Sequence, residues 1–227
     1  GNESKGYEIS NSLRFNDGDS PKLNKTFSTS QTNNKIMTFS FWLKRGVLGN
    51  NIKLLESYNG SNAGLAIKLT SSNIIEFTLT SGGVTEGQLI TNQVFRDVSS
   101  YYHLIFVLDT TNATGGDRMK MYVNGNEVTS FSTDTNPAQN TVIVWADNSV
   151  ANYIGSNFNG TGEYLDGYLS EFHFIDGTAK AQTDFGEFDD NGVWIPKKYT
   201  GSYGTNGFFL EFQQTGTSQN SSGIGAD

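Results

Sequence analysis

The stretch MKMYVNGNEVTSF, from Met119 to Phe131, places an Asn-Gly pair between two runs in which apolar and polar residues alternate. Asn124 and Gly125 both tolerate the positive φ that a type I′ turn demands, so the pattern predicts a tight β-hairpin. Taken alone, this hairpin indicates backbone geometry and no binding or catalysis. Its neighbours in the sequence are what make it informative.

The segments on both sides of the hairpin also have the pattern of strands. KIMTFSFWLKR, at Lys35–Arg45, alternates strictly, so Met37 to Leu43 should present every second side chain to one face. YYHLIFVLD, at Tyr101–Asp109, is apolar on both faces and is typical of a central strand that is covered on both sides. In Tyr164–Asp176 the apolar parity changes, which predicts a β-bulge near Ser170–Glu171. A short helix is expected only at 178–188.

Composition excludes several classes of protein. The 227-residue chain has a net charge of −8, which leaves no electrostatic footprint for nucleic acid. It has no cysteine, so neither disulfides nor thiolate metal sites are possible. No apolar run reaches the roughly 18 residues of a membrane span, so no membrane insertion is expected. The first ten residues lack the apolar region of a signal peptide.

The order of the strand-like segments resembles the laminin G-like and pentraxin-like branch of the concanavalin A-like lectin/glucanase superfamily. The matching stretches are SLRFNDGDS, MTFSFWLKRG, Tyr102-His103-Leu104, Asp109, Tyr122-Val123-Asn124-Gly125 and Gly167-Tyr168-Leu169-Ser170-Glu171-Phe172. The resemblance implies an all-β, jelly-roll β-sandwich of two curved antiparallel sheets. We expect this domain at 12–213, after an N-terminal extension at 1–11 and before a flexible C-terminal tail at 214–227.

The C-terminal third, from FIDGTAKAQTDF to GFFLEF, is similar to the version of this domain found in structural proteins of tailed phages, marine ones in particular. That similarity implies a tail-fibre or decoration protein at the virion surface, or another extracellular location. The implied partners are a host glycan or cell-surface polysaccharide, other virion proteins, and further copies of the chain.

The superfamily includes hydrolases, which carry paired carboxylates on one strand face. Glu171 and Asp176 are five residues apart and fall on opposite faces unless a bulge intervenes, and Glu187 and Asp189 lie in the expected helix or loop. The two histidines, His103 and His173, sit in the middle of strands, as hydrogen-bonded core histidines do. We therefore expect no enzyme activity, and a glycan hydrolase is the least favoured function.

A calcium site is a further expectation, because relatives of this kind often bind one structural calcium ion. The turn NDGDS supplies Asp17 and Asp19 around a glycine, and hard cations prefer such oxygen ligands. The same Asp-Gly-Asp sequence also makes a good turn without any metal. Both interpretations remain open from the sequence.

Sugar binding calls for aromatic faces beside polar side chains, placed in loops on a rigid scaffold. The best concentration of such residues is Val144–Tyr164. The candidate carbohydrate-binding residues are Trp42, Tyr58, Trp145, Asp147, Asn148, Tyr153, Asn157, Phe158, Glu163 and Tyr164. The competing interpretation is that aromatics such as Trp42 and Tyr153 are buried in the sheets.

These observations favour a non-catalytic carbohydrate-binding or adhesion module. The alternative is a purely structural or oligomerisation domain of a virion protein that binds no sugar. The two hypotheses differ in whether a glycan binds at all, so a glycan-binding assay separates them.

Overall fold

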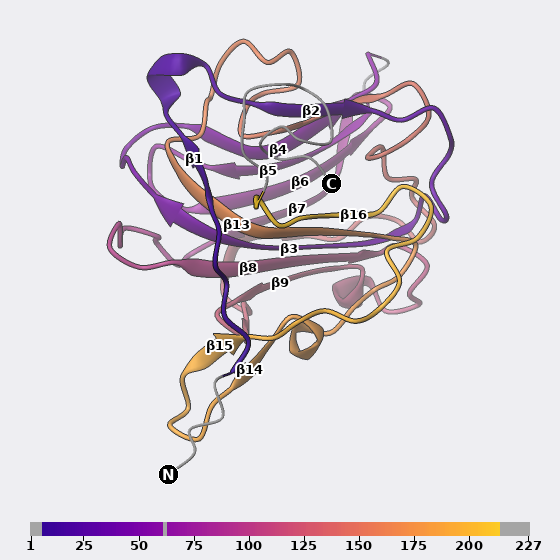
Figure 1. Ribbon diagram of the computed structural model, residues 1–227. Helices are drawn as coiled ribbons and strands as arrows, with labels where there is room; N and C mark the ends of the chain where they lie inside the picture. Colours follow the sequence, from indigo (N-terminus) through magenta and orange to yellow (C-terminus); the bar gives the residue numbers. More distant parts are fainter. Residues whose placement is uncertain (1–5, 61–62, 214–227) are drawn as a thin grey trace.

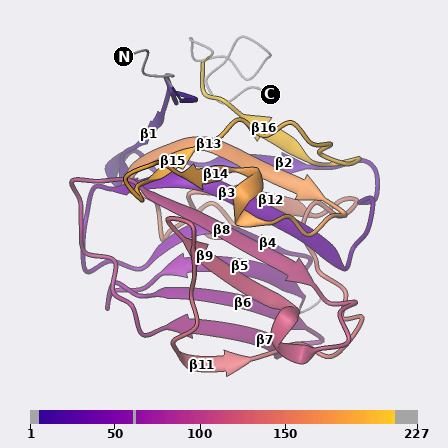
Figure 2. The ribbon, with the colours of Figure 1, turned by 90° about the horizontal axis from the view of Figure 1, so that it is seen from below.

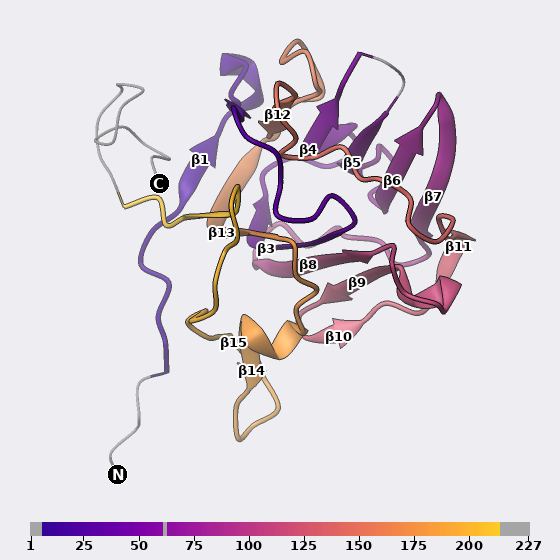
Figure 3. The same cartoon turned by 90° about the vertical axis from the view of Figure 1, so that its right-hand side faces the viewer.

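The computed structural model describes residues 6–60 and 63–213, and it consists of two antiparallel sheets stacked face to face (Figure 1). Sheet A contains β1 (Leu13–Phe15), β3 (Ile36–Arg45), β8 (Tyr102–Asp109), β9 (Met119–Val123), β10 (Asn126–Glu127), β13 (Gly167–Asp176) and β16 (Phe208–Leu210). Sheet B contains β2 (Leu23–Thr26), β4 (Ile52–Tyr58), β5 (Gly64–Leu69), β6 (Ile75–Ser81), β7 (Val84–Thr91), β11 (Phe131–Thr135) and β12 (Ala151–Ile154). The two layers are seen edge-on in Figures 2 and 3. This arrangement confirms the predicted jelly-roll β-sandwich.

The two sheets differ in how far apart in the sequence their neighbouring strands are. In sheet B, β4 to β7 form an uninterrupted meander. In sheet A, the long strands β3, β8 and β13 lie side by side at the centre. Outside the sheets, β14 (Gly186–Phe188) and β15 (Trp194–Pro196) form a separate hairpin that projects away from the sandwich (Figure 1).

The inner faces of both sheets share one hydrophobic core. Every second side chain of β3, from Met37 to Leu43, is buried in it, as the alternation of this segment predicts. Phenylalanine rings stack across the strands, with the Phe41 and Phe172 centroids 5.1 Å apart and nearly parallel. Stacked aromatic pairs add to the stabilisation that burial of their area provides. The core therefore fixes the relative position of the sheets.

The predicted bulge in β13 is present. The register with β3 shifts between Ser170 and His173, and Glu171 has a φ of 49°. Because one extra residue reverses the alternation, Leu169 and Phe172 both face the core. The bulge also turns Glu171 into the layer outside sheet A.

The opening hairpin has the predicted geometry and a second role. Asn124 and Gly125 have φ values of 47° and 79°, as a type I′ turn requires. The Asn124 side chain accepts a hydrogen bond from the backbone N–H of His103 on the neighbouring strand, at 2.7 Å. A Cβ on Gly125 would collide with the indole of Trp194. The turn is therefore also a docking point for β15.

Three helical segments are present in the described residues, and each is a single 3₁₀ turn: η1 (Asp17–Asp19), η2 (Gly115–Asp117) and η3 (Gln182–Asp184). The short helix expected at 178–188 is thus only η3, and Gly186–Phe188 forms β14 instead. The segment pairs with β15, and Phe188 lies opposite Trp194 and packs edge-on against it. Within residues 6–60 and 63–213, no helix has the length and hydrophobicity of a membrane span.

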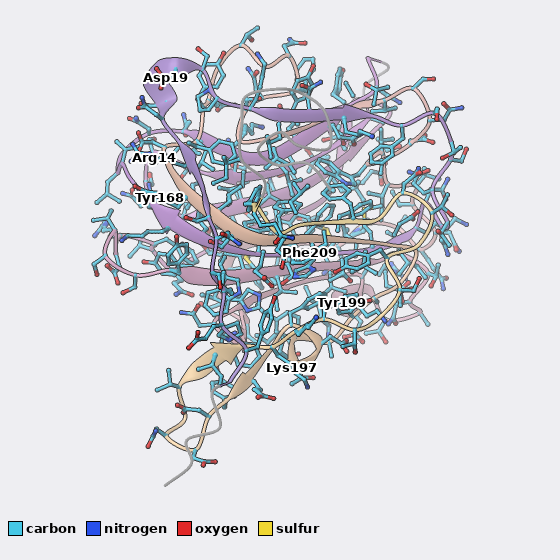
Figure 4. All side chains as sticks on the ribbon, viewed as in Figure 1. Arg14, Asp19, Tyr168, Lys197, Tyr199 and Phe209 are labelled. Atoms are coloured by element: carbon cyan, nitrogen blue, oxygen red, sulfur yellow. The ribbon has the colours of Figure 1, made fainter. Side chains whose placement is uncertain are left out.

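The chain after β13 covers the outer face of sheet A. Phe185 and Tyr199 from this segment pack on Ile105, Val107 and Ile175, which point outward from β8 and β13. Figure 4 shows Tyr199 and Phe209 on this side of the sheet. The double-sided hydrophobic pattern of Tyr101–Asp109 is explained by this cover. The predicted tail at 214–227 lies outside the described residues.

Candidate functional site

The outer face of sheet B carries a row of side chains that register places side by side. Tyr153 pairs with Glu56, Glu56 with Ala66, Ala66 with Thr78, and Thr78 with Gln88. Directly paired residues of antiparallel strands point to the same face of the sheet. The row therefore combines one aromatic ring, small side chains and hydrogen-bonding groups on one surface.

A second row lies next to the first and contains a hollow. Tyr58 pairs with Gly64, and Gly64 with Thr80. The hollow has a volume of about 230 Å³ and is lined by Glu56, Ser57, Tyr58, Gly64, Leu65, Ala66, Thr80 and Phe158. A Cβ on Gly64 would collide with the carbonyl oxygen of Ser57, so glycine allows β5 to lie this close to β4 beside the hollow. We call this hollow and the two rows the face-B site.

Phe158 forms a wall of the face-B site, and Glu56 holds it in place. The backbone N–H of Phe158 donates a hydrogen bond of 2.7 Å to the carboxylate of Glu56. The Phe158 ring then lies 4.9 Å from the Tyr58 ring, tilted by 49°. The other carboxylate oxygen of Glu56 accepts a hydrogen bond from the ammonium of Lys53. Glu56 is therefore a positioning residue for the aromatic wall.

The loop that carries Phe158 is held by further hydrogen bonds. The carbonyl of Gly160 accepts one from the Lys22 ammonium and one from the Tyr164 hydroxyl, both at 2.8 Å. The Asn157 side chain accepts one from the backbone N–H of Thr161, at 2.9 Å. These contacts order the loop before any ligand arrives, which lowers the entropy cost of binding.

A second hollow, of about 360 Å³, lies at the rim between loops. It is lined by Asp17, Gly49, Asn50, Asn51, Ser71, Glu163 and Tyr164. Three of the predicted site residues, Asp17, Glu163 and Tyr164, meet there. Asn157 belongs to the loop between the two hollows.

The residues expected to bind calcium do not form a ligand cage. Asp17 and Asp19 are exposed on η1, and Asp19 accepts a hydrogen bond from the Asn16 amide at 2.7 Å. In the described part of the chain, no three His, Cys, Asp or Glu side chains gather as a metal site would require. Calcium usually takes 6–8 oxygen ligands, including backbone carbonyls and waters as well as carboxylates. A calcium site, at this turn or elsewhere, stays a prediction.

Trp145 was predicted to bind sugar, and the structure corrects this. Its side chain is 1 % exposed and packs edge-on against Phe39, with the ring centroids 5.2 Å apart. The segment around it is tied down, because the Trp145 carbonyl accepts a hydrogen bond from Gln31 and the Ala146 carbonyl one from Asn206. Trp145 is therefore a core residue that closes one end of the sandwich.

The neighbours of Trp145 are also separate from the face-B site. Asp147 accepts a hydrogen bond from the backbone N–H of Asn148, at 2.8 Å. Asn148 is exposed and forms a bridge with Phe27. Neither residue lines one of the two hollows. Asp147 and Asn148 are therefore close to Tyr153 and Phe158 in the sequence but lie outside the face-B site.

Trp42 lies on the other side of the molecule, on the outer face of sheet A. Its ring stacks on His103, with centroids 4.4 Å apart and planes 3° from parallel. Trp194 donates its indole N–H to Nδ1 of His103, and Ser40 contacts Nε2, both at 2.8 Å. Burial lowers the pKa of His103 to about 3. The histidine is therefore neutral with its proton on Nε2, as a core histidine is.

His173 and Glu171 form a second buried cluster on the same side. Nδ1 of His173 lies 2.9 Å from the Tyr203 hydroxyl, and its ring stacks on Phe209 at 4.3 Å. The Tyr7 hydroxyl donates a hydrogen bond of 2.6 Å to Glu171. Burial lowers the pKa of His173, against the opposing effect of Glu171. These contacts make the cluster an anchor for the N-terminal segment.

The carboxylates considered for hydrolysis lack the geometry of a catalytic pair. Glu171 is buried beneath Tyr7, and Asp176 accepts hydrogen bonds from the backbone N–H groups of Thr32 and Asn206. Glu187 lies on the projecting hairpin, where it is 3.9 Å from Lys197. Glycosidases need two carboxyl groups that flank one bound sugar. Neither predicted pair provides that arrangement.

Sequence reasoning missed most of the face-B site. Tyr58, Tyr153 and Phe158 were predicted, whereas Glu56, Ala66, Thr78, Thr80 and Gln88 were not. Their signal is the alternation of AGLAIKLT and IIEFTLT, which puts small and hydroxyl side chains on the outward positions. Only the strand register shows that these positions meet Tyr58 and Phe158.

Comparison with known proteins places this geometry in a family. The family model described as the concanavalin A-like lectin/glucanases superfamily matches residues 17–183. No curated protein sequence matches the chain.

Solved structures share the fold at low sequence identity. A native heptameric SAP-like pentraxin from Limulus polyphemus is 16 % identical with a TM-score of 0.50, over 70 % of this chain and 71 % of that one. The CBM40 of a Ruminococcus gnavus IT-sialidase is 13 % identical with a TM-score of 0.50, over 71 % and 95 %. A mutant NanB sialidase from Streptococcus pneumoniae is 16 % identical with a TM-score of 0.51, over 79 % and 29 %. The chain belongs to the concanavalin A-like lectin/glucanase superfamily.

Proposed function

We propose that this protein is a non-catalytic carbohydrate-binding module and that the face-B site holds the glycan. The observation that carries the proposal is the wall of Phe158 and Tyr58 beside an open hollow floored by Gly64 and Ala66. A sugar ring presents C–H patches to aromatic faces and hydroxyl groups to polar side chains, and a mostly apolar pocket with a few polar groups suits it.

The polar groups of the site suit hydroxyl recognition. Thr78 and Thr80 have hydroxyl groups that both donate and accept hydrogen bonds. Gln88 donates to Glu76 and Thr78, both at 3.2 Å, so its side chain is held in position. Tyr153 adds an aromatic face at one end of the row, next to Glu56.

The proposal extends to location and biological role. The resemblance of the C-terminal third to domains of tailed-phage structural proteins supports a place on a virion surface, as a tail-fibre or decoration module that recognises a host glycan. A second candidate is a structural domain that assembles with virion proteins or with copies of itself. The projecting β14–β15 hairpin favours it, because Phe188 and Val193 are 50 % and 55 % exposed.

Filling the hollow tests the first proposal. Ala66 lines the hollow and is half-buried, so Ala66→Tyr should occupy the sugar position without entering the core. The matched control is Ala179→Tyr, at an exposed position beyond β13. Both variants and the unmodified protein would be applied to a glycan array that includes bacterial surface polysaccharides.

We expect Ala66→Tyr to lose binding by at least about tenfold, whereas Ala179→Tyr should bind as the unmodified protein does. Binding that survives Ala66→Tyr would place the site elsewhere. The absence of any bound glycan, together with a stable oligomer in solution, would favour the structural role instead.

A further inference from the structure

We propose that the face-B site selects uncharged oligosaccharides and rejects glycans that carry carboxylate or sulfate groups. This inference rests on the proposed function, because it names the class of glycan that the same site takes. It is carried by the carboxylate partners that the two lysines on the central strands of sheet B already have.

The two cations on the central strands of sheet B are neutralised by carboxylates. The Lys68 ammonium lies 3.1 Å from Glu76 on the neighbouring strand. The Lys53 ammonium contacts Glu56 and lies 3.9 Å from Glu163. An anionic sugar would have to displace one of these carboxylates before it could gain a charged partner of its own.

Arginine, the side chain best suited to a carboxylate, is missing from sheet B. Its planar fork binds carboxylates with two parallel hydrogen bonds. The chain has four arginines, Arg14, Arg45, Arg96 and Arg118, and none of them lies on a strand of sheet B. Arg45 is buried in sheet A, and the guanidinium of Arg118 donates to the carbonyls of Asn112, Ala113 and Pro137.

The remaining charges near the site also disfavour an anion. β4 to β7 carry three carboxylates, Glu56, Glu76 and Glu86, against the two lysines. Lys22 contacts the loop that carries Phe158, where its ammonium donates to the Gly160 carbonyl. Burying a charged group without an opposite charge costs far more than burying a hydroxyl group. A neutral sugar meets no such penalty here.

Matched glycan pairs test the inference. Each pair consists of a neutral oligosaccharide and its sialylated, uronic-acid or sulfated counterpart, lactose and 3′-sialyllactose among them, measured by array and then by calorimetry. We expect the neutral member to bind and the acidic member to bind at least about tenfold more weakly.

A single substitution should change this preference. Glu76→Gln removes the partner of Lys68 while its amide oxygen can still accept the hydrogen bond from Gln88. We expect acidic glycans to gain at least about fivefold in affinity for the Glu76→Gln variant, at low salt, with neutral binding unchanged. Adding Ala66→Tyr to the Glu76→Gln variant should abolish the binding of both neutral and acidic glycans.

The outcomes separate this inference from the proposed function. Two results together support both the selectivity and the proposed function. Neutral glycans bind and Ala66→Tyr abolishes that binding, and acidic glycans bind weakly but more tightly to the Glu76→Gln variant. Tighter binding of the acidic members to the unmodified protein would overturn the selectivity while leaving glycan binding intact. Failure of every glycan to bind would overturn the proposed function itself.

Discussion

The outer faces of the two sheets carry similar residue types, but the segment after β13 covers the face of sheet A, whereas the face of sheet B has an open hollow. On sheet A, aromatic and ionisable residues lie beneath the segment that follows β13, so His103 and His173 are almost fully buried. On sheet B, aromatic and polar residues line an open hollow. Figure 3 shows the covering segment on the side of sheet A that faces away from sheet B.

This difference teaches that a strand pattern alone does not identify a binding face. Trp42 and Tyr153 are both outward-pointing aromatics on strands of the sandwich. Trp42 stacks on His103 in the covered layer, whereas Tyr153 stands beside Glu56 at the open face. Both rings are half-buried, and they differ in their surroundings: Trp42 contacts the buried His103, whereas Tyr153 lies at the open face-B site. Substitutions should therefore affect stability on sheet A and binding on sheet B.

The largest effect is expected for Trp194→Ala. Trp194 covers His103 and donates its indole N–H to it, so the substitution leaves a cavity and an unpaired Nδ1. We expect the free energy of unfolding to fall by about 3–5 kcal/mol in denaturant titrations, with glycan binding retained.

Phe188→Ala on the same hairpin is the control, because half of this side chain is exposed. It should cost less than about 1 kcal/mol. If the Trp194→Ala protein folds but no longer binds glycan, the outer face of sheet A also contributes to binding and the two faces do not have separate roles.

The next effect is a dependence of stability on pH that originates in sheet A. Burial lowers the pKa of His103 to about 3, while an unfolded histidine titrates near 6.5. Between these values the unfolded state binds a proton that the folded state does not. The free energy of unfolding should therefore fall as pH drops below about 6, by up to about 1.4 kcal/mol per pH unit.

His103→Gln removes this titration, so denaturant titrations from about pH 7 to about pH 4 should show a flatter slope for the variant. The unmodified protein should keep the steeper slope, to which His173 also contributes because burial lowers its pKa too. Equal slopes in both proteins would mean that His103 is protonated in the folded state.

On sheet B, Phe158→Ala should weaken glycan binding by about tenfold and reduce stability by no more than about 1 kcal/mol. The ring is half-buried against Tyr58, and its loss leaves the loop held by Glu56 through the Phe158 backbone N–H. Calorimetry on an array hit measures the affinity. Phe188→Ala serves again as the matched control and should bind glycan normally. If the Phe158→Ala protein keeps its full affinity, the Phe158 ring does not contribute to glycan binding.

The smallest effect is expected from chelation. Since Asp17 and Asp19 do not gather a ligand cage, EDTA should shift the Tm by less than about 1 °C. A rise of several degrees on adding calcium would contradict this expectation and show that the protein has a calcium site.

Much of the fold could be predicted from sequence because alternation, bulges and turns are local. The parity change at Ser170–Glu171 and the Asn124-Gly125 turn both have their predicted geometry. The site was harder to predict because it depends on register between strands. Trp145 is eight residues from Tyr153 in the sequence but in the core, whereas Ala66 and Phe158 are far apart in the sequence and line one hollow.

The most direct test of the central claim, that the glycan surface is the outer face of sheet B, is an NMR titration. The ¹⁵N-labelled protein would be titrated with the neutral oligosaccharide that binds best on the array, and amide shifts would be mapped. We predict the largest shifts at Ala66, Thr80 and Phe158, with none above background at His103 or Trp194. Shifts that centre on His103 and Trp194, or on Asn50 and Ser71 at the rim, would contradict the account.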